Sequence, residues 1–309
     1  MSGAATATVF APGKVNLGLR VSALRGDGYH EIDTLFATVD VGDVVHVRRT
    51  GRGVHGRVVD AREAEGGDGG DAPLPDLAGG NLAADAAAAW RAAADPGGLG
   101  VEIVLEKRLP VAAGLGGGSS DAGAVLRALQ ALAGPDALPA DALQAVAKGL
   151  GSDVPFFAAG VAAARGRGRG ERLRPTDLPP RWGVLLRPPV AVSAGEAYRA
   201  LGGFGPPIAW DAVLEAWAAG GTPRWRNDLQ PGVGTRHAPV RAALAALRNA
   251  ELGAPILSGS GATCFALAPD EAAAHRAADH LAGEHPDAWV RAVRVPAPDA
   301  LRAPTLTTP

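Results

Sequence analysis

The stretch EKRLPVAAGLGGGSSDAGAVLRALQALAG, residues 106–134, joins a strand pattern to a helix pattern through a run of glycines. In front of it, residues 101–106 alternate apolar and polar side chains, as a strand with one buried face does. Behind the glycines, apolar residues fall on one face of a helix: Val125, Leu126, Leu129 and Leu132. The sequence therefore predicts a strand, a glycine loop and a helix in immediate succession.

This succession is typical of an anion-binding site. The first N–H groups of a helix have no partner inside the helix, and the helix dipole attracts negative charge to this end. Glycines in front of the helix let a ligand approach these groups closely, and we expect a serine, Ser119 or Ser120, to cap the helix. The loop is therefore predicted to bind a polyphosphate. The alternative is a glycine-rich turn that only connects the strand to the helix.

Three familiar nucleotide-binding motifs do not fit this loop. A Walker A motif needs a lysine after its last glycine, and none follows here. The dinucleotide fingerprint needs a third glycine at the position of Ser119. A protein kinase would carry its catalytic-loop signature further along the chain, and the sequence lacks one.

Composition narrows the class of protein. The chain has 309 residues and a formal net charge of -2, which argues against a general nucleic-acid or membrane-surface partner. Its single cysteine, Cys264, excludes an intramolecular disulfide and a cysteine-based zinc site, and we expect it in the core. Without a signal-peptide pattern or an 18-residue apolar run, we expect a cytoplasmic protein. Lysine is scarce, since Lys14, Lys107 and Lys148 are the only three.

Strand and helix patterns alternate without a regular βαβ rhythm, which favours an α+β fold. We expect short strands at 6–10 and 14–21, and two more within 34–48 around a turn at Gly42 and Asp43. Residues 63–80 are rich in Gly, Asp and Pro and are predicted to form a mobile loop, after which Asn81 caps a helix. A second helix is expected at 139–150.

The boundary between two halves is expected near residues 175–181, which gives domains 1–175 and 176–309. The second half is predicted to contain strands and helices at the following positions: a strand at 183–187, helices near 210–219 and 239–250, paired strands within 255–268, a helix at 270–282 and a last strand at 288–295.

The motif PVAAGLGGGSSDA, residues 110–122, resembles the phosphate-binding motif of the GHMP kinases, the small-molecule kinases that include galactokinase, homoserine kinase and mevalonate kinase. Further stretches resemble one member of that family: APGKVNLGL (11–19), GDGYHEIDTLF (26–36), GSDVPFF (151–157) and LSGSGATCFAL (257–267). That member uses ATP to phosphorylate the 2-hydroxyl of a cytidine diphosphate derivative of a branched polyol, in a route to isoprenoid precursors.

The resemblance implies an N-terminal domain like ribosomal protein S5 domain 2 and a ferredoxin-like C-terminal domain. It implies ATP and Mg²⁺ as cofactors, a small-molecule substrate, no nucleic-acid or membrane partner, and a monomer or weak homodimer. Two alternatives remain open at this point. One is a GHMP kinase that acts on another alcohol, and the other is a non-catalytic nucleotide- or RNA-binding protein that uses the Arg-Gly segment at 165–172.

By resemblance, Asp153 is the base or orienting group for the acceptor hydroxyl, and Lys14 is its catalytic partner. Asn16 follows on the same strand face as Lys14, and it is expected to bind substrate or Asp153. Tyr29 and His30 are expected to bind the cytosine, by stacking and by hydrogen bonding. The alternatives are an Asp in a turn, an exposed lysine, and a Tyr-His pair that only packs a loop.

The remaining candidate residues fall into two groups, also by resemblance. ATP is expected to contact Lys107, Pro110, Gly114, Leu115, Gly116, Gly117, Gly118, Ser119 and Ser120, while the ligands of Mg²⁺ stay open between Ser120 and Asp121. A third motif is expected to close the site and consists of Ser258, Gly259, Ser260 and Gly261. In one departure, Ala194 stands where the family often has a threonine, so a substrate contact is expected to be absent there.

Overall fold

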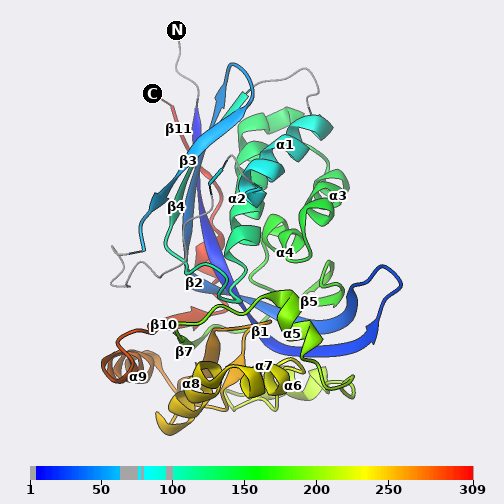
Figure 1. Ribbon diagram of the computed structural model, residues 1–309. Helices are drawn as coiled ribbons and strands as arrows, with labels where there is room; N and C mark the ends of the chain where they lie inside the picture. The colour runs from blue at the N-terminus through cyan, green and yellow to red at the C-terminus, as the bar shows by residue number, and fades with distance from the viewer. Residues whose placement is uncertain (1–4, 63–75, 78–79, 95–99, 309) are drawn as a thin grey trace.

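The computed structural model describes residues 5–62, 76–77, 80–94 and 100–308, and it combines helices with two β-sheets (Figure 1). A larger sheet occupies the upper part of the view and a smaller one the lower part, each with helices beside it. The predicted α+β class is therefore confirmed. Among the helices of the described residues, none is long and apolar enough to cross a membrane.

Two long antiparallel strands, β1 (Thr6–Leu24) and β2 (His30–Thr50), form the backbone of the larger sheet. The prediction of four shorter strands is wrong here. Gly42 and Asp43 do not turn the chain, because they continue β2 opposite residues of β1. The pair bends at β-bulges instead, which lie between Pro12 and Lys14, between Asn16 and Leu19, and between Val21 and Ala23.

The strands of the larger sheet follow the order β11-β1-β2-β4-β3, and β5 and β6 attach to the other end of β2. Their bounds are β3 (Val54–Asp60), β4 (Gly100–Lys107), β5 (Ala163–Gly168), β6 (Arg172–Pro175) and β11 (Thr305–Thr307). Only the β3–β4 pair is parallel among the pairs described in this sheet. Strand β4 leads directly into the glycine loop, as predicted.

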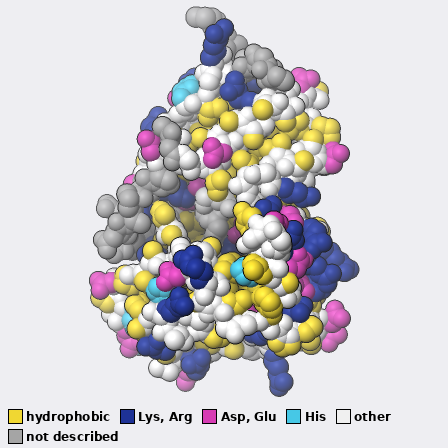
Figure 2. Space-filling model, turned by 45° about the vertical axis from the view of Figure 1, so that its right-hand side comes forward, with side chains coloured by type: hydrophobic (Ala, Val, Ile, Leu, Met, Phe, Trp, Pro, Cys, Tyr) yellow, Lys and Arg dark blue, Asp and Glu magenta, His cyan; other side chains and the backbone are white. Residues whose placement is uncertain are grey.

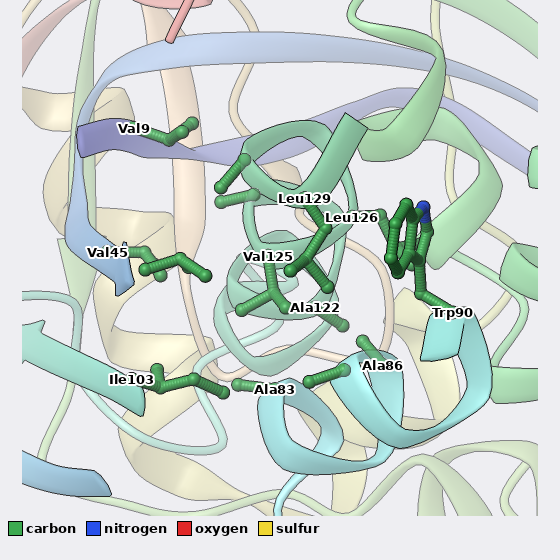
Figure 3. Packing of buried hydrophobic residues seen from close by; sticks show 14 of the residues in the cluster. Val9, Val45, Ala83, Ala86, Trp90, Ile103, Ala122, Val125, Leu126 and Leu129 are labelled. Carbon is green, nitrogen blue, oxygen red and sulfur yellow. The ribbon is translucent and has the colours of Figure 1, made fainter. Parts of the chain in front are cut away.

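Helices cover one face of this sheet: α1 (Leu82–Ala94), α2 (Gly117–Ala133), α3 (Ala140–Leu150) and α4 (Val154–Ala159) (Figure 1). Figure 3 shows how α2 directs Val125 and Leu129 toward the strands that carry Val9 and Val45. Asn81 caps α1 as predicted, since its side-chain oxygen accepts a hydrogen bond from the Ala83 N–H at 2.9 Å. This apolar packing fixes the N-terminus of α2 against the sheet.

The smaller sheet is antiparallel and has the strand order β10-β7-β9-β8. Its strands are β7 (Arg181–Arg187), β8 (Ile256–Leu257), β9 (Cys264–Leu267) and β10 (Trp289–Val295). The helices of this part are α5 (Ala194–Arg199), α6 (Trp210–Ala218), α7 (Gln230–Arg236), α8 (Ala238–Asn249) and α9 (Glu271–Glu284). The elements predicted for the second half are confirmed, and Cys264 is buried as predicted.

The two sheets share a hydrophobic core. Leu17 and Leu35 from β1 and β2 belong to the same buried cluster as Leu185, Phe265 and Val293 of the smaller sheet. The chain also crosses between the sheets near its end, because β11 pairs with β1. The division into domains 1–175 and 176–309 stays a prediction. The loop predicted at 63–80 lies almost wholly outside the described residues.

Candidate active site

The glycine loop ends at the N-terminus of α2, but the cap differs from the one predicted. Gly116 is the cap residue, with a left-handed φ of 70°, and no side chain caps the helix. Ser119 and Ser120 therefore lie inside the first turn, and the serine cap is wrong. The hydroxyl of Ser120 donates to the Pro12 carbonyl at 2.7 Å, which ties the helix to β1. The N–H groups of Gly117, Gly118 and Ser119 are left without helical partners.

The third motif packs directly on the glycine loop. Gly114 has a φ of 77°, and a Cβ there would lie 2.5 Å from the Ser258 carbonyl oxygen. The Ser258 hydroxyl donates to the Gly114 carbonyl at 3.1 Å, and the Thr263 N–H donates to the Ala113 carbonyl at 3.1 Å. Two segments that are far apart in the sequence thus form one continuous wall. Glycine is required at position 114, because any side chain would force this wall apart.

Lys14 and Asp153 come together beside this wall, as the sequence predicts. The Lys14 Nζ lies 3.5 Å from an Asp153 carboxylate oxygen and donates to the Gly114 carbonyl at 3.0 Å. Lys14 is 4 % exposed, so the alternative of a solvated surface lysine is excluded. Asp153 precedes α4 without capping it by a side-chain hydrogen bond, and its carboxylate keeps partial access to solvent.

A buried chain of hydrogen bonds orients Lys14. The Lys14 Nζ donates to Asn16 Oδ1 at 2.8 Å, and Asn16 Nδ2 donates to Thr34 Oγ1 at 2.8 Å. The Thr34 hydroxyl in turn donates to the Gly18 carbonyl at 2.6 Å. Asn16 therefore contacts Lys14 in this structure and has no bond to Asp153 among the described contacts. The sequence analysis assigned no role to Thr34, although it lies within the stretch GDGYHEIDTLF (26–36); the structure places it against Asn16 of the neighbouring strand.

Asn227 is a second residue that the sequence analysis missed. It is 3 % exposed, and its Nδ2 donates to the carbonyls of Leu257 at 2.8 Å and Gly259 at 2.7 Å. A Cβ at Gly259 would lie 3.1 Å from Asn16 Oδ1 and 3.2 Å from the Lys14 Nζ. Asn227 therefore holds the third motif against the Lys14 side chain. In the sequence, Asn227 begins the stretch NDLQP (227–231), from which no role could be derived.

Lys107, at the end of β4, lies between two carboxylates. Its Nζ donates to Asp43 Oδ2 and, at 2.8 Å, to Asp121 Oδ2. Burial alone would lower the pKa of Lys107, but the two carboxylates outweigh burial and raise it. Burial and the negative charge of Asp43 raise the pKa of Asp121 well above its ordinary value, against the attraction of Lys107. The charge of Lys107 is thus already neutralised inside the protein.

Asp43 also fixes the start of the glycine loop. Its Oδ1 accepts hydrogen bonds from the N–H groups of Arg108 at 2.6 Å and Leu109 at 2.8 Å. Asp43, which was predicted to lie in a turn, is therefore part of β2 and holds both Lys107 and the backbone at the start of the glycine loop. Asp121 differs from it, because its Oδ1 is buried without a hydrogen-bond partner.

A cavity of about 830 Å³ extends from the Lys14–Asp153 pair to an aromatic rim. Tyr29, His30 and Tyr198 line the rim, so both tyrosines of the chain lie in this cavity. The His30 and Tyr198 rings stack with their centroids 4.7 Å apart. Burial, together with the negative charge of Asp153, raises the pKa of Tyr198, which therefore stays a neutral phenol. Tyr198 was not predicted, because α5 carries no recognisable motif.

A second cavity, of about 360 Å³, lies on the other side of the glycine loop. Its lining includes Lys107, Pro110, Gly117, Gly118 and Asp121. Gly114, Gly116 and Ser119 line both cavities. The glycine loop therefore forms a wall between two binding spaces, and the Lys14–Asp153 pair stands on one side of it.

The other predicted residues occupy the following positions. Gly259 and Ser260 line the larger cavity, whereas Ser258 is fully buried and supports the loop. Leu115 is buried in the core, and its carbonyl accepts the Lys14 N–H at 2.8 Å. Gly261, the last residue of the third motif, takes a φ of 88°. Ala194 begins α5 and lines the larger cavity without a polar side chain.

Comparison with known proteins places this geometry in a family. The model of the GHMP kinases N terminal domain matches residues 81–161, and that of the GHMP kinases C terminal matches residues 213–287. The 4-diphosphocytidyl-2-C-methyl-D-erythritol kinase of Deinococcus radiodurans is 45 % identical over 94 % of this chain and 93 % of its own length. The enzyme of that name from Thermus thermophilus is 42 % identical over 91 % and 93 %.

Solved structures agree with these matches. A crystal structure of 4-(cytidine 5'-diphospho)-2C-methyl-D-erythritol kinase is 40 % identical, covers 93 % of this chain and 98 % of its own, and has a TM-score of 0.77. Homoserine kinase from Cytophaga hutchinsonii has a TM-score of 0.63 at 20 % identity, with 98 % and 97 % coverage, and shares the fold. The chain belongs to the GHMP kinases and, within them, to the 4-diphosphocytidyl-2-C-methyl-D-erythritol kinase family.

Proposed function

We propose that the protein transfers the γ-phosphoryl group of ATP to the 2-hydroxyl of 4-diphosphocytidyl-2-C-methyl-D-erythritol, the compound for which its relatives are named. The observation that carries the proposal is the shared wall of two cavities. Gly114, Gly116 and Ser119 face both spaces, and Lys14 with Asp153 stands beside them. A donor bound on one side and an acceptor on the other would meet at this wall, which is what in-line transfer requires.

The smaller cavity suits the phosphates of ATP. The unpaired N–H groups at the start of α2 are suited to bind phosphate oxygens, and the helix dipole adds to this attraction. At Gly118, an added Cβ would have only Leu82 within 4 Å and would otherwise occupy the space of the cavity. The glycines therefore keep room for a ligand, and we propose that Pro110 and Gly114 through Ser119 contact ATP. Ser120 and Leu115 support the loop from behind.

The residues present also fit a magnesium ion carried by ATP. Within the described part of the chain, no group of three or more His, Cys, Asp or Glu could hold a metal by itself. Asp121 lines the smaller cavity, and its carboxylate is the acidic group of that lining that could bind the cation. Mg²⁺, held mainly by phosphate oxygens, would neutralise negative charge on the transferred group.

Asp153 and Lys14 act on the acceptor. We propose that the Asp153 carboxylate accepts the proton of the 2-hydroxyl while the hydroxyl oxygen forms a bond to the γ-phosphorus. The bond between that phosphorus and the bridging oxygen breaks, and ADP leaves. The Lys14 ammonium keeps Asp153 ionised and stabilises the negative charge that gathers on the transferred group. Asn16 keeps the ammonium in this position. No covalent phosphoenzyme is needed.

The aromatic rim suits the cytidine. Tyr29, His30 and Tyr198 offer stacking faces and a hydrogen-bonding ring to a pyrimidine. We further propose that the enzyme is cytoplasmic, where ATP is supplied, and that it acts as a monomer or weak homodimer without a nucleic-acid partner.

The test measures ADP release with ATP, Mg²⁺ and the diphosphocytidyl substrate, for the wild type and Asp153→Asn. We expect turnover by the wild type and a loss of at least about 10²-fold in kcat for the variant. Asp177→Asn is the matched control, because Asp177 is exposed and outside both cavities. A folded wild type that binds ATP but does not turn over this substrate would refute the substrate assignment. An unchanged kcat in Asp153→Asn would refute the role of Asp153.

A further inference from the structure

Several arginines of β5, β6 and the β1–β2 turn are neutralised by carboxylates. Arg165 makes two hydrogen bonds to the Asp33 carboxylate, at 2.8 and 2.6 Å. Arg25 and Arg172 both pair with Glu31. On the face drawn in Figure 2, dark blue basic side chains gather at the right-hand edge beside magenta carboxylates. Such paired charges do not call for an anionic ligand.

Arg169 and Arg199 break this pattern. Both line the larger cavity, and neither guanidinium has an ion pair or hydrogen bond with any other described residue. Asp27, which attracts Arg169 at longer range, is bonded to Arg25. Glu171 uses its carboxylate to accept the backbone N–H of Arg169 at 2.6 Å. The cavity therefore carries two positive charges at its base end that the described protein does not neutralise.

One of these arginines packs on an aromatic ring of the rim, and the other follows one in the sequence. The Arg169 guanidinium carbon lies 4.7 Å from the centroid of the Tyr29 ring. Arg169 occupies the turn between β5 and β6, where Gly168 and Gly170 take φ values of 77° and 114°. Arg199 is the last residue of α5 and directly follows Tyr198. Stacking faces and unpaired guanidinium groups therefore line the same cavity.

We propose that Arg169 and Arg199 bind the diphosphate of the cytidine substrate. A guanidinium presents a fork of N–H donors that matches phosphate oxygens, and its hydrogen bonds to an anion are among the strongest in proteins. Lys14 is engaged elsewhere, because it contacts Asp153 and is proposed to act on the transferred phosphoryl group. The inference rests on the proposed function and adds a basis for specificity, since an acceptor alcohol without a diphosphate would leave both charges unused.

The Arg-Gly segment thus gains a role that its sequence did not suggest. A plain glycine turn would need no arginine at position 169, and an RNA-binding segment would not place its charge inside a small-molecule cavity. Arg165 and Arg167 of the same strand contact Asp33, at 2.6 and 3.9 Å, and stay outside the cavity lining. Of these three arginines, only Arg169 lines the cavity.

Calorimetric titration with cytidine, CMP and CDP tests the proposal without requiring turnover. We expect Arg169→Gln and Arg199→Gln each to weaken CDP binding about tenfold and cytidine binding less than about twofold, because only CDP carries the diphosphate. Tyr198→Leu should weaken cytidine and CDP by the same factor, since it removes a stacking face. Arg174→Gln is the matched control, an exposed arginine of β6 outside this cavity.

Steady-state kinetics supply a second measurement. In Arg169→Gln, the KM of the diphosphocytidyl substrate should rise about tenfold, while kcat and the KM of ATP stay within about threefold. Equal weakening of cytidine and CDP would overturn the proposal and leave Arg169 as a support for Tyr29. Unchanged CDP binding in both arginine variants would also overturn it. A wild type that binds neither cytidine nor CDP would refute the proposed function itself, and this inference with it.

Discussion

The two ends of the larger cavity are built in different ways. At the phosphate end, Lys14 is 4 % exposed, and its side chain contacts one backbone carbonyl, a buried asparagine and one carboxylate. At the base end, Tyr29 is 52 % exposed and stands on the turn between β1 and β2. The first end is fixed by strands, glycines and a helix terminus. The second consists of side chains on two hairpin turns and the short helix α5.

This difference separates the reaction from the choice of substrate. The fold extends to the L. major mevalonate kinase, which has a TM-score of 0.59 at 13 % identity and covers 93 % of this chain. A likeness at this low identity concerns the fold alone. The strands and the helix terminus that build the phosphate end are part of that fold. Side chains on turns can change without disturbing that scaffold. We infer that the phosphate end determines the reaction and that the rim determines the substrate.

The largest effect is expected at the phosphate end. Lys14→Met should lower kcat about 10²- to 10³-fold, because it removes a positive charge beside the transferred group and leaves Asp153 without its partner. The KM of the diphosphocytidyl substrate should change much less. Steady-state kinetics with each substrate varied in turn provide the measurement.

Lys148→Met is the matched control for this prediction. Lys148 is one of only three lysines, it is exposed, and it lines neither of the two cavities. We expect it to retain wild-type kinetics. An equal loss of activity in the two variants, or a folded Lys14→Met enzyme with more than about a third of the wild-type kcat, would contradict the role of Lys14.

A smaller effect, on stability, should separate the two carboxylates that contact Lys107. Asp43→Asn should lower the free energy of unfolding by about 2–4 kcal/mol, because a buried Lys107 loses a charged partner that also binds two backbone N–H groups. Asp121→Asn should change it by less than about 1 kcal/mol, because one oxygen of Asp121 is already unpartnered. Urea unfolding at pH 7 measures both, and equal losses would contradict this account of the cluster.

The pH dependence of the same variants sharpens this prediction. Burial and Asp43 raise the pKa of Asp121, so the folded chain holds this proton more tightly than the unfolded chain. The stability that the Asp121 proton contributes is therefore complete below about pH 4, where an ordinary carboxyl group is protonated in the unfolded chain as well. It is lost as the pH rises through the higher pKa that Asp121 has in the folded chain. The wild type should therefore lose stability relative to Asp121→Asn as the pH rises. If the difference in unfolding free energy between the wild type and Asp121→Asn stays constant with pH, the raised pKa of Asp121 is contradicted.

Local patterns in the sequence predicted the phosphate end well. The alternation before residue 107 and the helical face after residue 124 gave β4 and α2, and the glycines between them mark the loop. Lys14 and Asp153 were paired through resemblance, and the structure brings them to 3.5 Å. The cap of α2 was predicted wrongly. The stretch GGGSS offers both serines and glycines as the residue before the helix, and Gly116, in a left-handed conformation, takes that position in the structure.

The residues that sequence reasoning missed act through contacts distant in the chain. Asp43 was read as part of a turn, because Gly-Asp usually marks one, whereas long-range pairing with β1 keeps β2 continuous there. Asn227 is 30 residues or more from the carbonyls it holds. Tyr198 and Arg169 meet the rim only after α5 and the β5–β6 turn fold toward the β1–β2 turn. No local periodicity carries such information.

The most direct test of the division between reaction and recognition compares two acceptors. The wild type would be assayed with 4-diphosphocytidyl-2-C-methyl-D-erythritol and with the same polyol carrying only a monophosphate in place of the cytidine diphosphate. We predict that kcat/KM falls at least about 10³-fold for the truncated acceptor, because its rim contacts are lost, while the KM of ATP stays unchanged. Similar kcat/KM values for the two acceptors would contradict the account, since the rim would then have no part in selecting the substrate.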